Sequence, residues 1–353
     1  MAGPRPAGID RSTEPPDRDA TAIPQATGRA VKPRVFIPDP IADCGIKRLE
    51  PQCACLTPWR DGAPPDAKAA QSLLYSADAV IVRLFSISAS DLDQCTQLKV
   101  IAKHGVGVDN IDCRAATARR IPVLYTPEAN SNAVAEHAVG LMLALARQVA
   151  PASLATREGR FNERGRFQGV ELAGKILGVA GLGRVGARVA QIAAHGLAMN
   201  VLAHDPVIDP NDYAGPATPV GTFAELLPRC DFLTLHVPLT SQTKHLIDDH
   251  ALSAMKSTCR IINTSRGAVV DETALVRALT DQQIGGAALD VFEAEPLPAN
   301  HPLCNTPNTL LTPHISSSTD ESLDRMADTA ARGVLDVLNG RAPKYIVNPE
   351  SRK

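Results

Sequence analysis

Three ionisable residues, Arg266, Glu295 and His314, each follow or end an apolar run in the C-terminal third of the chain. An arginine presents a planar fork of donors that can hold a carboxylate through two parallel hydrogen bonds. A carboxylate bonded to an imidazole favours the charged ring, which can then act as an acid near neutral pH. Together they suggest a site that binds a carboxylate and transfers a proton, although a lone arginine is more often a surface residue.

A second chemical signal lies in residues 174–186, where an apolar run breaks into a GxGxxG turn. Gly181 permits a tight strand-to-helix turn, Gly183 lets the backbone approach a pyrophosphate, and Gly186 lets the helix pack against the strand. The N–H groups at the start of a helix over 184–195 would then face the phosphates. The order of strand, turn and helix predicts a dinucleotide-binding βαβ unit.

Asp205 closes the next apolar run, at about the offset from the glycines where an acidic residue binds the adenosine ribose. A carboxylate there can accept hydrogen bonds from both ribose hydroxyls and would repel a 2′-phosphate. NAD is therefore preferred over NADP as the predicted cofactor. The alternative is an exposed turn aspartate before Pro206.

The elements that must position these residues alternate in the manner of an α/β protein. A long helix from Ser131 or Asn132 to Ala146 is predicted to link two domains, with Glu136 and His137 in structural roles, and an amphipathic helix over 320–338 is predicted to return to the first domain. The spacing predicts two doubly wound parallel sheets of Rossmann or flavodoxin-like type with a cleft between them. The predicted strands are 34–37, 79–82, 100–102, 121–124, 200–203, 232–237, 260–263, 286–291 and 309–311, besides the strand of the dinucleotide unit that opens at Lys175, and a helix is predicted over 272–279.

Length and composition agree with two domains and a small-molecule partner. The chain has 353 residues, 44% of them hydrophobic, and a formal net charge of −2, which gives no electrostatic case for nucleic acid or an anionic membrane. Its eight cysteines show neither zinc-like nor disulfide-like spacing, and no apolar run reaches the roughly 18 residues of a membrane helix. We expect a cytoplasmic protein without a metal site, preceded by a disordered extension over residues 1–32.

The combined motifs resemble the NAD-dependent D-2-hydroxyacid dehydrogenases, the family that includes phosphoglycerate dehydrogenase. The resemblance covers about Pro33 to Pro349, and the motifs that carry it are Gly-Leu-Gly-Arg-Val-Gly, Asp205, residues 235–240, 263–267, 288–292, Glu295-Pro296 and Thr312-Pro313-His314. It implies a discontinuous substrate domain, 33–130 with 314–348, and an NAD domain over 131–313. Formate dehydrogenases of similar fold carry glutamine in place of Glu295, so that branch is disfavoured.

The resemblance also implies roles for single residues. Arg266 would bind the substrate carboxylate and carbonyl, His314 would be the acid/base, and Glu295 would hold it. Asp290 would bond the nicotinamide carboxamide and Arg184 would lie beside the pyrophosphate. The complete set implied to bind the cofactor is Gly181, Gly183, Arg184, Val185, Gly186, Asp205, His236, Pro238, Thr264 and Asp290.

Residues 103–112 resemble the substrate loop of the family, in which N–H groups of the turn Gly105-Val106-Gly107 bind the carboxylate. His104 replaces the alanine that is common there, and a buried, hydrogen-bonded histidine is favoured over a second acid/base. Arg83 matches a position that reaches the distal end of the substrate. The following Leu84-Phe85 departs from the small polar residues usual there, which puts phosphate recognition in doubt.

The resulting interpretation is a homodimeric NAD-dependent dehydrogenase that reduces a small 2-keto acid of the hydroxypyruvate, glyoxylate or phosphohydroxypyruvate class. Two alternatives stay open on the sequence alone. One is an NAD-sensing scaffold like the corepressors that share the fold, and the other is an NAD-dependent hydrolase, which would not need Arg266 or His314.

Overall fold

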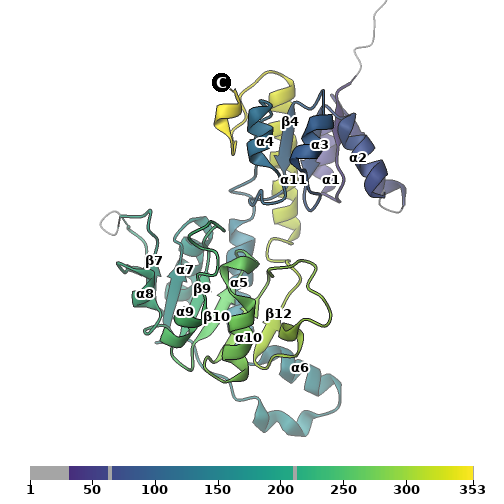
Figure 1. Ribbon diagram of the computed structural model, residues 1–353. Coiled ribbons are helices and arrows are strands. Elements are labelled where there is room, and N and C mark those ends of the chain that lie inside the picture. The colour runs from purple at the N-terminus through teal and green to yellow at the C-terminus, as the bar shows by residue number, and fades with distance from the viewer. Residues whose placement is uncertain (1–31, 63–65, 210–212, 353) are drawn as a thin grey trace, which may run out of the picture. The chain divides into compact units, whose positions relative to one another are not determined.

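The structure is a computed structural model that describes residues 32–62, 66–209 and 213–352. Apart from Lys32, the extension predicted over residues 1–32 lies outside these ranges. The described chain contains two parallel sheets, one of five and one of seven strands, each with helices packed on it (Figure 1). The predicted fold class is therefore confirmed.

The five-stranded sheet has the strand order β2-β1-β3-β4-β5, with every neighbouring pair parallel. This is the flavodoxin-like order. Its strands are β1 (Arg34–Phe36), β2 (Ala54–Leu56), β3 (Ala79–Val82), β4 (Val100–Lys103) and β5 (Val123–Leu124). Helices α1 (Asp43–Leu49) and α11 (Asp320–Leu338) pack on one face, and α2 (Ala67–Tyr75), α3 (Ala89–Gln94) and α4 (Cys113–Ala118) on the other.

The seven-stranded sheet has the order β12-β11-β10-β9-β6-β7-β8, again parallel throughout. The strands follow the Rossmann order. The direction in which successive strands are added reverses between β6 and β9, and dinucleotides bind at such a switch point. The strands are β6 (Ile176–Ala180), β7 (Asn200–His204), β8 (Thr218–Pro219), β9 (Phe232–Leu235), β10 (Arg260–Asn263), β11 (Gly286–Leu289) and β12 (Thr309–Leu311). The associated helices are α5 (Ser131–Ala146), α7 (Arg184–Gly196), α8 (Phe223–Leu226), α9 (Asp249–Ala254) and α10 (Glu272–Thr280).

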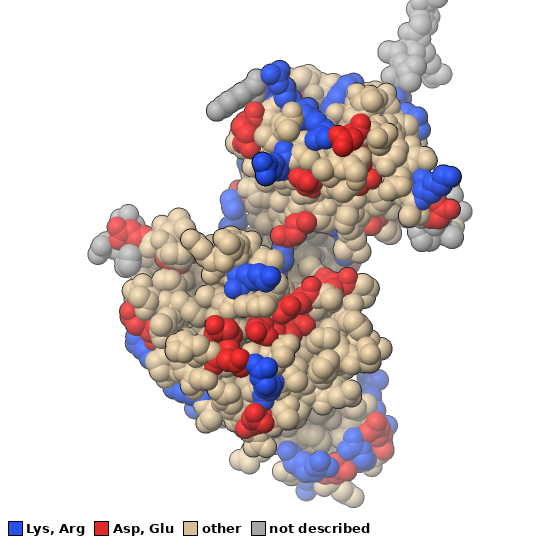
Figure 2. Space-filling view, in the orientation of Figure 1, with Lys and Arg blue, Asp and Glu red and all other residues tan. Residues whose placement is uncertain are grey.

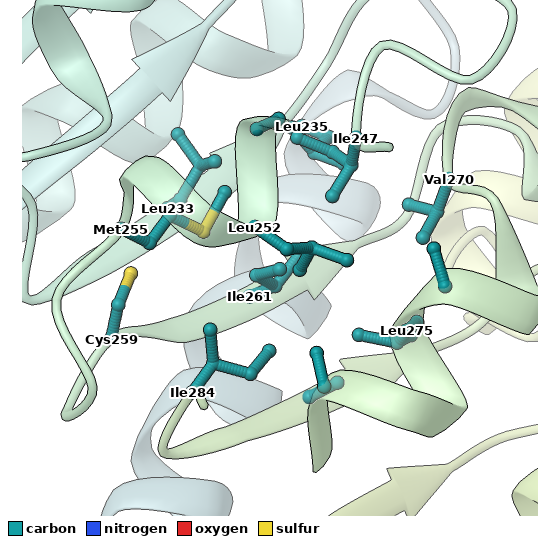
Figure 3. Close-up of a cluster of buried hydrophobic side chains, with 14 of the residues drawn as sticks. Leu233, Leu235, Ile247, Leu252, Met255, Cys259, Ile261, Val270, Leu275 and Ile284 are labelled. Carbon is teal, nitrogen blue, oxygen red and sulfur yellow. The ribbon is translucent and has the colours of Figure 1, made fainter. Parts of the chain in front are cut away.

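Both faces of the larger sheet are buried, which explains why its strands read as continuous apolar runs. Successive residues of β10 point to opposite faces: Ile261 packs with α9 and α10, while Ile262 packs with α5 and α7. Figure 3 shows the first of these clusters, in which Leu252 and Leu275 close over Ile261. This packing fixes the strand ends from which the functional loops emerge.

The element predictions were right in type and less accurate at their ends. The helix α11 spans 320–338 as predicted, and it packs on the five-stranded sheet through Ala327, Ala330 and Val334. The missed elements include β2 and β8, whose three and two residues are too few to show a period, and α6 (Val149–Arg157), which carries a proline at position 151. Short 3₁₀ turns complete the chain at Pro58–Asp61, Phe161–Arg166, Gly267–Val269, Pro302–Asn305 and Pro349–Arg352.

Within the described residues, no single helix is both long and apolar enough to cross a membrane. Only α5 and α6 taken together, with a bend of 64° between them, pass on length and composition. Helix α5 buries eight of its sixteen residues, and six of these pack in the cluster that it forms with the seven-stranded sheet and α7, as in a core helix.

Candidate active site

The glycine turn after β6 has the tight geometry that its sequence predicts. Gly181 adopts a φ of 92°, and a Cβ there would lie 2.8 Å from the His236 carbonyl oxygen. A Cβ on Gly186 would lie 1.9 Å from the Gly181 carbonyl oxygen. Side chains at either position would push α7 and β9 away from β6, so these two glycines bring the helix N-terminus to the switch point.

The third glycine, Gly183, faces open space. It is the N-cap of α7, no side chain caps this helix, and a Cβ at Gly183 would meet no atom within 4 Å. The first N–H groups of a helix otherwise need a side-chain or ligand acceptor. An open approach to these donors fits the pyrophosphate of a dinucleotide.

Asp205 lies at the edge of the same turn, just beyond β7. One carboxylate oxygen accepts from the Leu182 N–H at 2.8 Å and the other from the Val207 N–H at 2.9 Å. These bonds fix the carboxylate beside the turn, and each oxygen keeps a further lone pair for a ligand hydroxyl.

The other residues predicted to contact the cofactor surround this edge. Thr264 follows β10 and is buried, and its hydroxyl has no hydrogen-bond partner in the described chain. His236 follows β9, bonds Thr234 Oγ1 through Nε2 at 2.9 Å, and burial lowers its pKa to about 4, so it is neutral near pH 7. Arg184 is largely exposed and lies 3.9 Å from Glu128. Val185 packs on the core, and Pro238 is exposed with its carbonyl bonded to Thr243.

The three ionisable residues singled out from the sequence follow three adjacent strands: Arg266 after β10, Glu295 after β11 and His314 after β12. Glu295 Oε2 lies 2.7 Å from His314 Nδ1, and Glu295 Oε1 accepts from the Phe292 N–H at 3.0 Å. Burial opposes ionisation of Glu295, but these two hydrogen bonds outweigh it and hold the pKa of the carboxyl below its usual value. The ring nitrogen Nε2 of His314 is left for a substrate.

Asp290 anchors the turn that carries His314. Its side chain is fully buried and its oxygens accept from the Thr312 hydroxyl at 2.6 Å and from the N–H groups of Ile315 and Ser316 at 2.9 and 2.8 Å. Burial opposes ionisation here too, yet these donors and His137 lower the pKa of Asp290 to about 2. Contact of Asp290 with the nicotinamide stays a prediction.

His137, which the sequence places in a structural role on the linking helix, joins this network. Its Nε2 lies 3.3 Å from Thr312 Oγ1 and 3.5 Å from Asp290 Oδ1. Nothing in the sequence pairs residue 137 with residues 290 and 312, because the contact depends on α5 packing under β11 and β12.

Arg266 reaches the substrate turn of the other sheet. Its Nε donates to Asp109 at 2.8 Å, and a Cβ on Gly107 would lie 1.3 Å from Arg266 Nη2, so only glycine leaves room for the guanidinium. The Gly105 N–H is already bonded to Thr126 Oγ1 at 3.1 Å. No acceptor in the described chain bonds the N–H of Val106 or Gly107, so these two remain as donors for a carboxylate.

Arg83 lies at the end of β3, where its Nη2 is 3.3 Å from Ser318 Oγ. The turn that it starts is held by Asp39, whose Oδ2 accepts from the N–H groups of Arg83, Leu84 and Phe85 at 2.8 to 3.0 Å. Leu84 is 73% exposed. Sequence reasoning did not select Asp39, because its partners lie more than forty positions away along the chain.

His104 is buried, with 3% of its surface exposed, as predicted. The predicted hydrogen bond is not found: neither ring nitrogen has a partner of good geometry within the described residues. Burial and the charge of Arg83 lower its pKa to about 4, which makes it a neutral residue and a poor acid near pH 7. No group of three or more potential metal ligands occurs in the described residues.

A dinucleotide turn at a switch point, with an arginine and a histidine–glutamate pair on adjacent strand ends, defines the class of dinucleotide-dependent dehydrogenases. Within that class the chain belongs to the D-isomer specific 2-hydroxyacid dehydrogenase family, whose NAD-binding domain matches residues 139–316. It is thus an oxidoreductase that acts on the CH–OH group of 2-hydroxy acids with NAD(P). The family predicted from the motifs is confirmed.

Sequence relatives and a solved structure support this membership. A glyoxylate reductase of Thermofilum pendens is 39% identical over 91% of this chain and 96% of its own length. A D-3-phosphoglycerate dehydrogenase of Methanocaldococcus jannaschii is 42% identical over 78% of this chain, which spans about half of that protein (52%). A structure of the NADPH-dependent glyoxylate/hydroxypyruvate reductase of Sinorhizobium meliloti, in complex with NADP and malonate, superposes with a TM-score of 0.80 at 28% identity, covering 91% of this chain and 98% of that one.

Proposed function

We propose that this protein is an NAD-preferring D-2-hydroxyacid dehydrogenase that reduces glyoxylate or hydroxypyruvate, with Arg266, Glu295 and His314 as its catalytic residues. The observation that carries the proposal is the contact of Arg266 with the Gly107 turn. It brings a guanidinium next to two unbonded N–H groups, and such a combination binds a carboxylate.

The residues support the following sequence of events in reduction. Arg266, Val106 and Gly107 hold the substrate carboxylate, which fixes the 2-carbonyl near His314. NADH, when bound, supplies the hydride to the carbonyl carbon. His314 donates a proton from Nε2 to the carbonyl oxygen, while Glu295 on Nδ1 stabilises the charged ring and fixes its orientation. Prior positioning of these groups contributes much of the rate acceleration.

The preference for NAD rests on Asp205. Its carboxylate is fixed at the edge of the glycine turn, where it would accept from the ribose hydroxyls and repel a 2′-phosphate. The remaining predicted cofactor contacts, from Arg184, His236, Pro238, Thr264 and Asp290, belong to the same proposal.

The choice of a small, unphosphorylated substrate rests on the distal end of the site. Leu84 beside Arg83 offers no polar side chain for a phosphate, and glyoxylate reductases match the chain over almost their whole length. Arg83 is proposed to contact the distal end of hydroxypyruvate. Arg83→Ala should then impair hydroxypyruvate and spare glyoxylate, which has no distal group.

We further propose that residues 33–130 and 314–348 form the substrate domain and 131–313 the NAD domain of a cytoplasmic homodimer. Exposed apolar side chains on α5, α6 and the following 3₁₀ turn support the dimer, and they are Leu143, Val149, Leu154 and Phe161, each 36–61% exposed. Light scattering on the purified chain and on a Leu154→Asp/Phe161→Asp variant tests this: a monomeric wild type would refute it.

The experiment that tests the function measures NADH and NADPH oxidation with glyoxylate, hydroxypyruvate and phosphohydroxypyruvate. We expect NADH with glyoxylate or hydroxypyruvate to give the highest kcat/KM. Equal use of both cofactors would refute the NAD assignment, and a preference for phosphohydroxypyruvate would refute the substrate assignment.

A further inference from the structure

The guanidinium of Arg266 is held at two of its three nitrogens by the protein itself. Its Nε donates to Asp109 Oδ2 at 2.8 Å, and its Nη1 donates to the Ser265 carbonyl at 2.6 Å. A guanidinium has five N–H donors, so both N–H groups of Nη2 and one of Nη1 remain. The free edge of the fork is therefore the Nη1–Nη2 edge.

One end of this free edge, Nη2, lies against the substrate turn. The position of a Cβ on Gly107 would be 1.3 Å from Nη2 and 2.9 Å from Asp109 Oδ2, so the guanidinium and the carboxylate that bonds its Nε both lie against Gly107. The unbonded N–H groups of Val106 and Gly107 lie on the same turn. An anion beside this turn could thus contact the remaining N–H groups of Nη1 and Nη2 while Asp109 stays bonded to Nε.

The backbone beside Asp109 is anchored by the side chain of the next residue. The neighbouring Asn110 accepts from Lys103 Nζ at 2.6 Å and donates to the Phe85 carbonyl at 2.6 Å, which ties the turn to the end of β3. The Asp109 side chain remains 59% exposed, so solvent screens its charge and its contribution lies more in geometry than in Coulomb attraction.

We propose that Asp109 is a positioning residue that fixes the orientation of Arg266, so that its Nη edge and the Val106–Gly107 turn meet the substrate carboxylate. This inference rests on the proposed function, because it assumes that Arg266 binds that carboxylate. Asp109 touches no reacting atom. It removes rotational freedom from the arginine before the substrate arrives, which is an entropic contribution to binding.

Asp109 could instead compete with the substrate carboxylate for Arg266, and this role predicts the opposite effect on substrate binding. If Asp109 competed with the substrate for Arg266, removing its charge would strengthen substrate binding. The positioning role depends on the hydrogen-bond acceptor rather than on the charge, so the two roles separate in a pair of variants. Asp109→Asn keeps an oxygen for the Nε–H and removes the charge, while Asp109→Ala removes both.

The test measures kcat and KM for glyoxylate at saturating NADH, together with the dissociation constant of oxalate from the enzyme–NADH complex, for the wild type and both variants. We expect Asp109→Ala to raise KM and the oxalate dissociation constant about tenfold, a loss of about 1.4 kcal/mol. Asp109→Asn should stay within about threefold of the wild type, and kcat should change less than KM in both variants.

Asp93→Ala is the matched control, since it removes an exposed aspartate from an ion pair with Arg119 on the outer helices. Tighter oxalate binding in both Asp109 variants would overturn the proposal in favour of competition, and unchanged binding in Asp109→Ala would overturn it altogether. Should Asp109→Ala not fold, Asp109→Ser is the substitute. The proposed function fails separately, if the wild type does not reduce 2-keto acids or if Arg266→Lys leaves kcat/KM unchanged.

Discussion

Glu295 Oε2 lies 2.7 Å from His314 Nδ1, across two loops that follow adjacent strands of the seven-stranded sheet. The carboxylate accepts a second hydrogen bond from the Phe292 N–H, so it is held before it contacts the ring. This arrangement turns Nε2 of His314 into the only ring nitrogen available to a substrate, and it makes the pair directly testable.

His314→Ala should lower kcat by about 10²–10⁴-fold, the usual range for loss of a positioned proton donor. Dissociation of NADH should change little, because the ring is proposed to act on the substrate. Glu295→Gln should move the loss of reductase activity at alkaline pH to lower pH, since the protonated ring loses its carboxylate partner. A pH–rate profile that is unmoved by Glu295→Gln would separate Glu295 from catalysis.

Asp205 should set the ratio of kcat/KM for NADH and NADPH. Asp205→Asn removes the charge and keeps an oxygen for the Leu182 N–H, although its NH2 group cannot accept from the Val207 N–H, so it should raise kcat/KM for NADPH relative to that for NADH. Asp205→Ala should also weaken the binding of NADH, by roughly 1–3 kcal/mol, because the variant loses the hydrogen bonds that Asp205 makes to the turn and would make to the ribose. An unchanged ratio in both variants would show that residue 205 does not face the ribose.

His137 should affect turnover through Asp290 and Thr312 rather than through a ligand. His137→Phe should lower kcat about tenfold, while His137→Gln, which keeps a donor near the position of Nε2, should recover most of it. Glu136→Ala on the same helix is the control, since Glu136 bonds only the exposed Asn132 in the described contacts. Equal losses in the Phe and Gln variants would contradict a hydrogen-bonding role.

His104 should make stability depend on pH. Its pKa lies near 4 in the folded chain and near 6.5 when unfolded, so between these values the unfolded chain binds more protons. The contribution of His104 to the free energy of unfolding should therefore be fully present above pH 6.5. Between pH 7 and pH 5 this group should lower the free energy of unfolding by about 2 kcal/mol. Urea unfolding at pH 7 and pH 5 should show a smaller decrease in the free energy of unfolding for His104→Leu than for the wild type. An equal decrease would show that His104 is not responsible for the pH dependence.

The sequence by itself determined the parts of this protein whose signals are local. A short apolar run that ends in three glycines at fixed spacing indicates a buried strand followed by a tight turn and a helix, so β6, α7 and the Gly181 turn follow from residues within one short segment. The strand ends also predicted that Arg266, Glu295 and His314 would share one edge of a sheet. Their identities as a set pointed to the family, which the comparisons confirm.

Only the tertiary structure decided which side chains meet. His137 reaches Asp290 because α5 packs under β11 and β12, and Asp39 caps the turn after β3 because β1 and β3 are neighbours in the sheet. The Gly105 N–H is lost as a donor because Thr126 lies beside it, and Arg266 meets Asp109 across 157 positions of chain. Such contacts depend on how segments that are distant in the sequence pack together, and residue types and their local spacing do not indicate which of these segments meet.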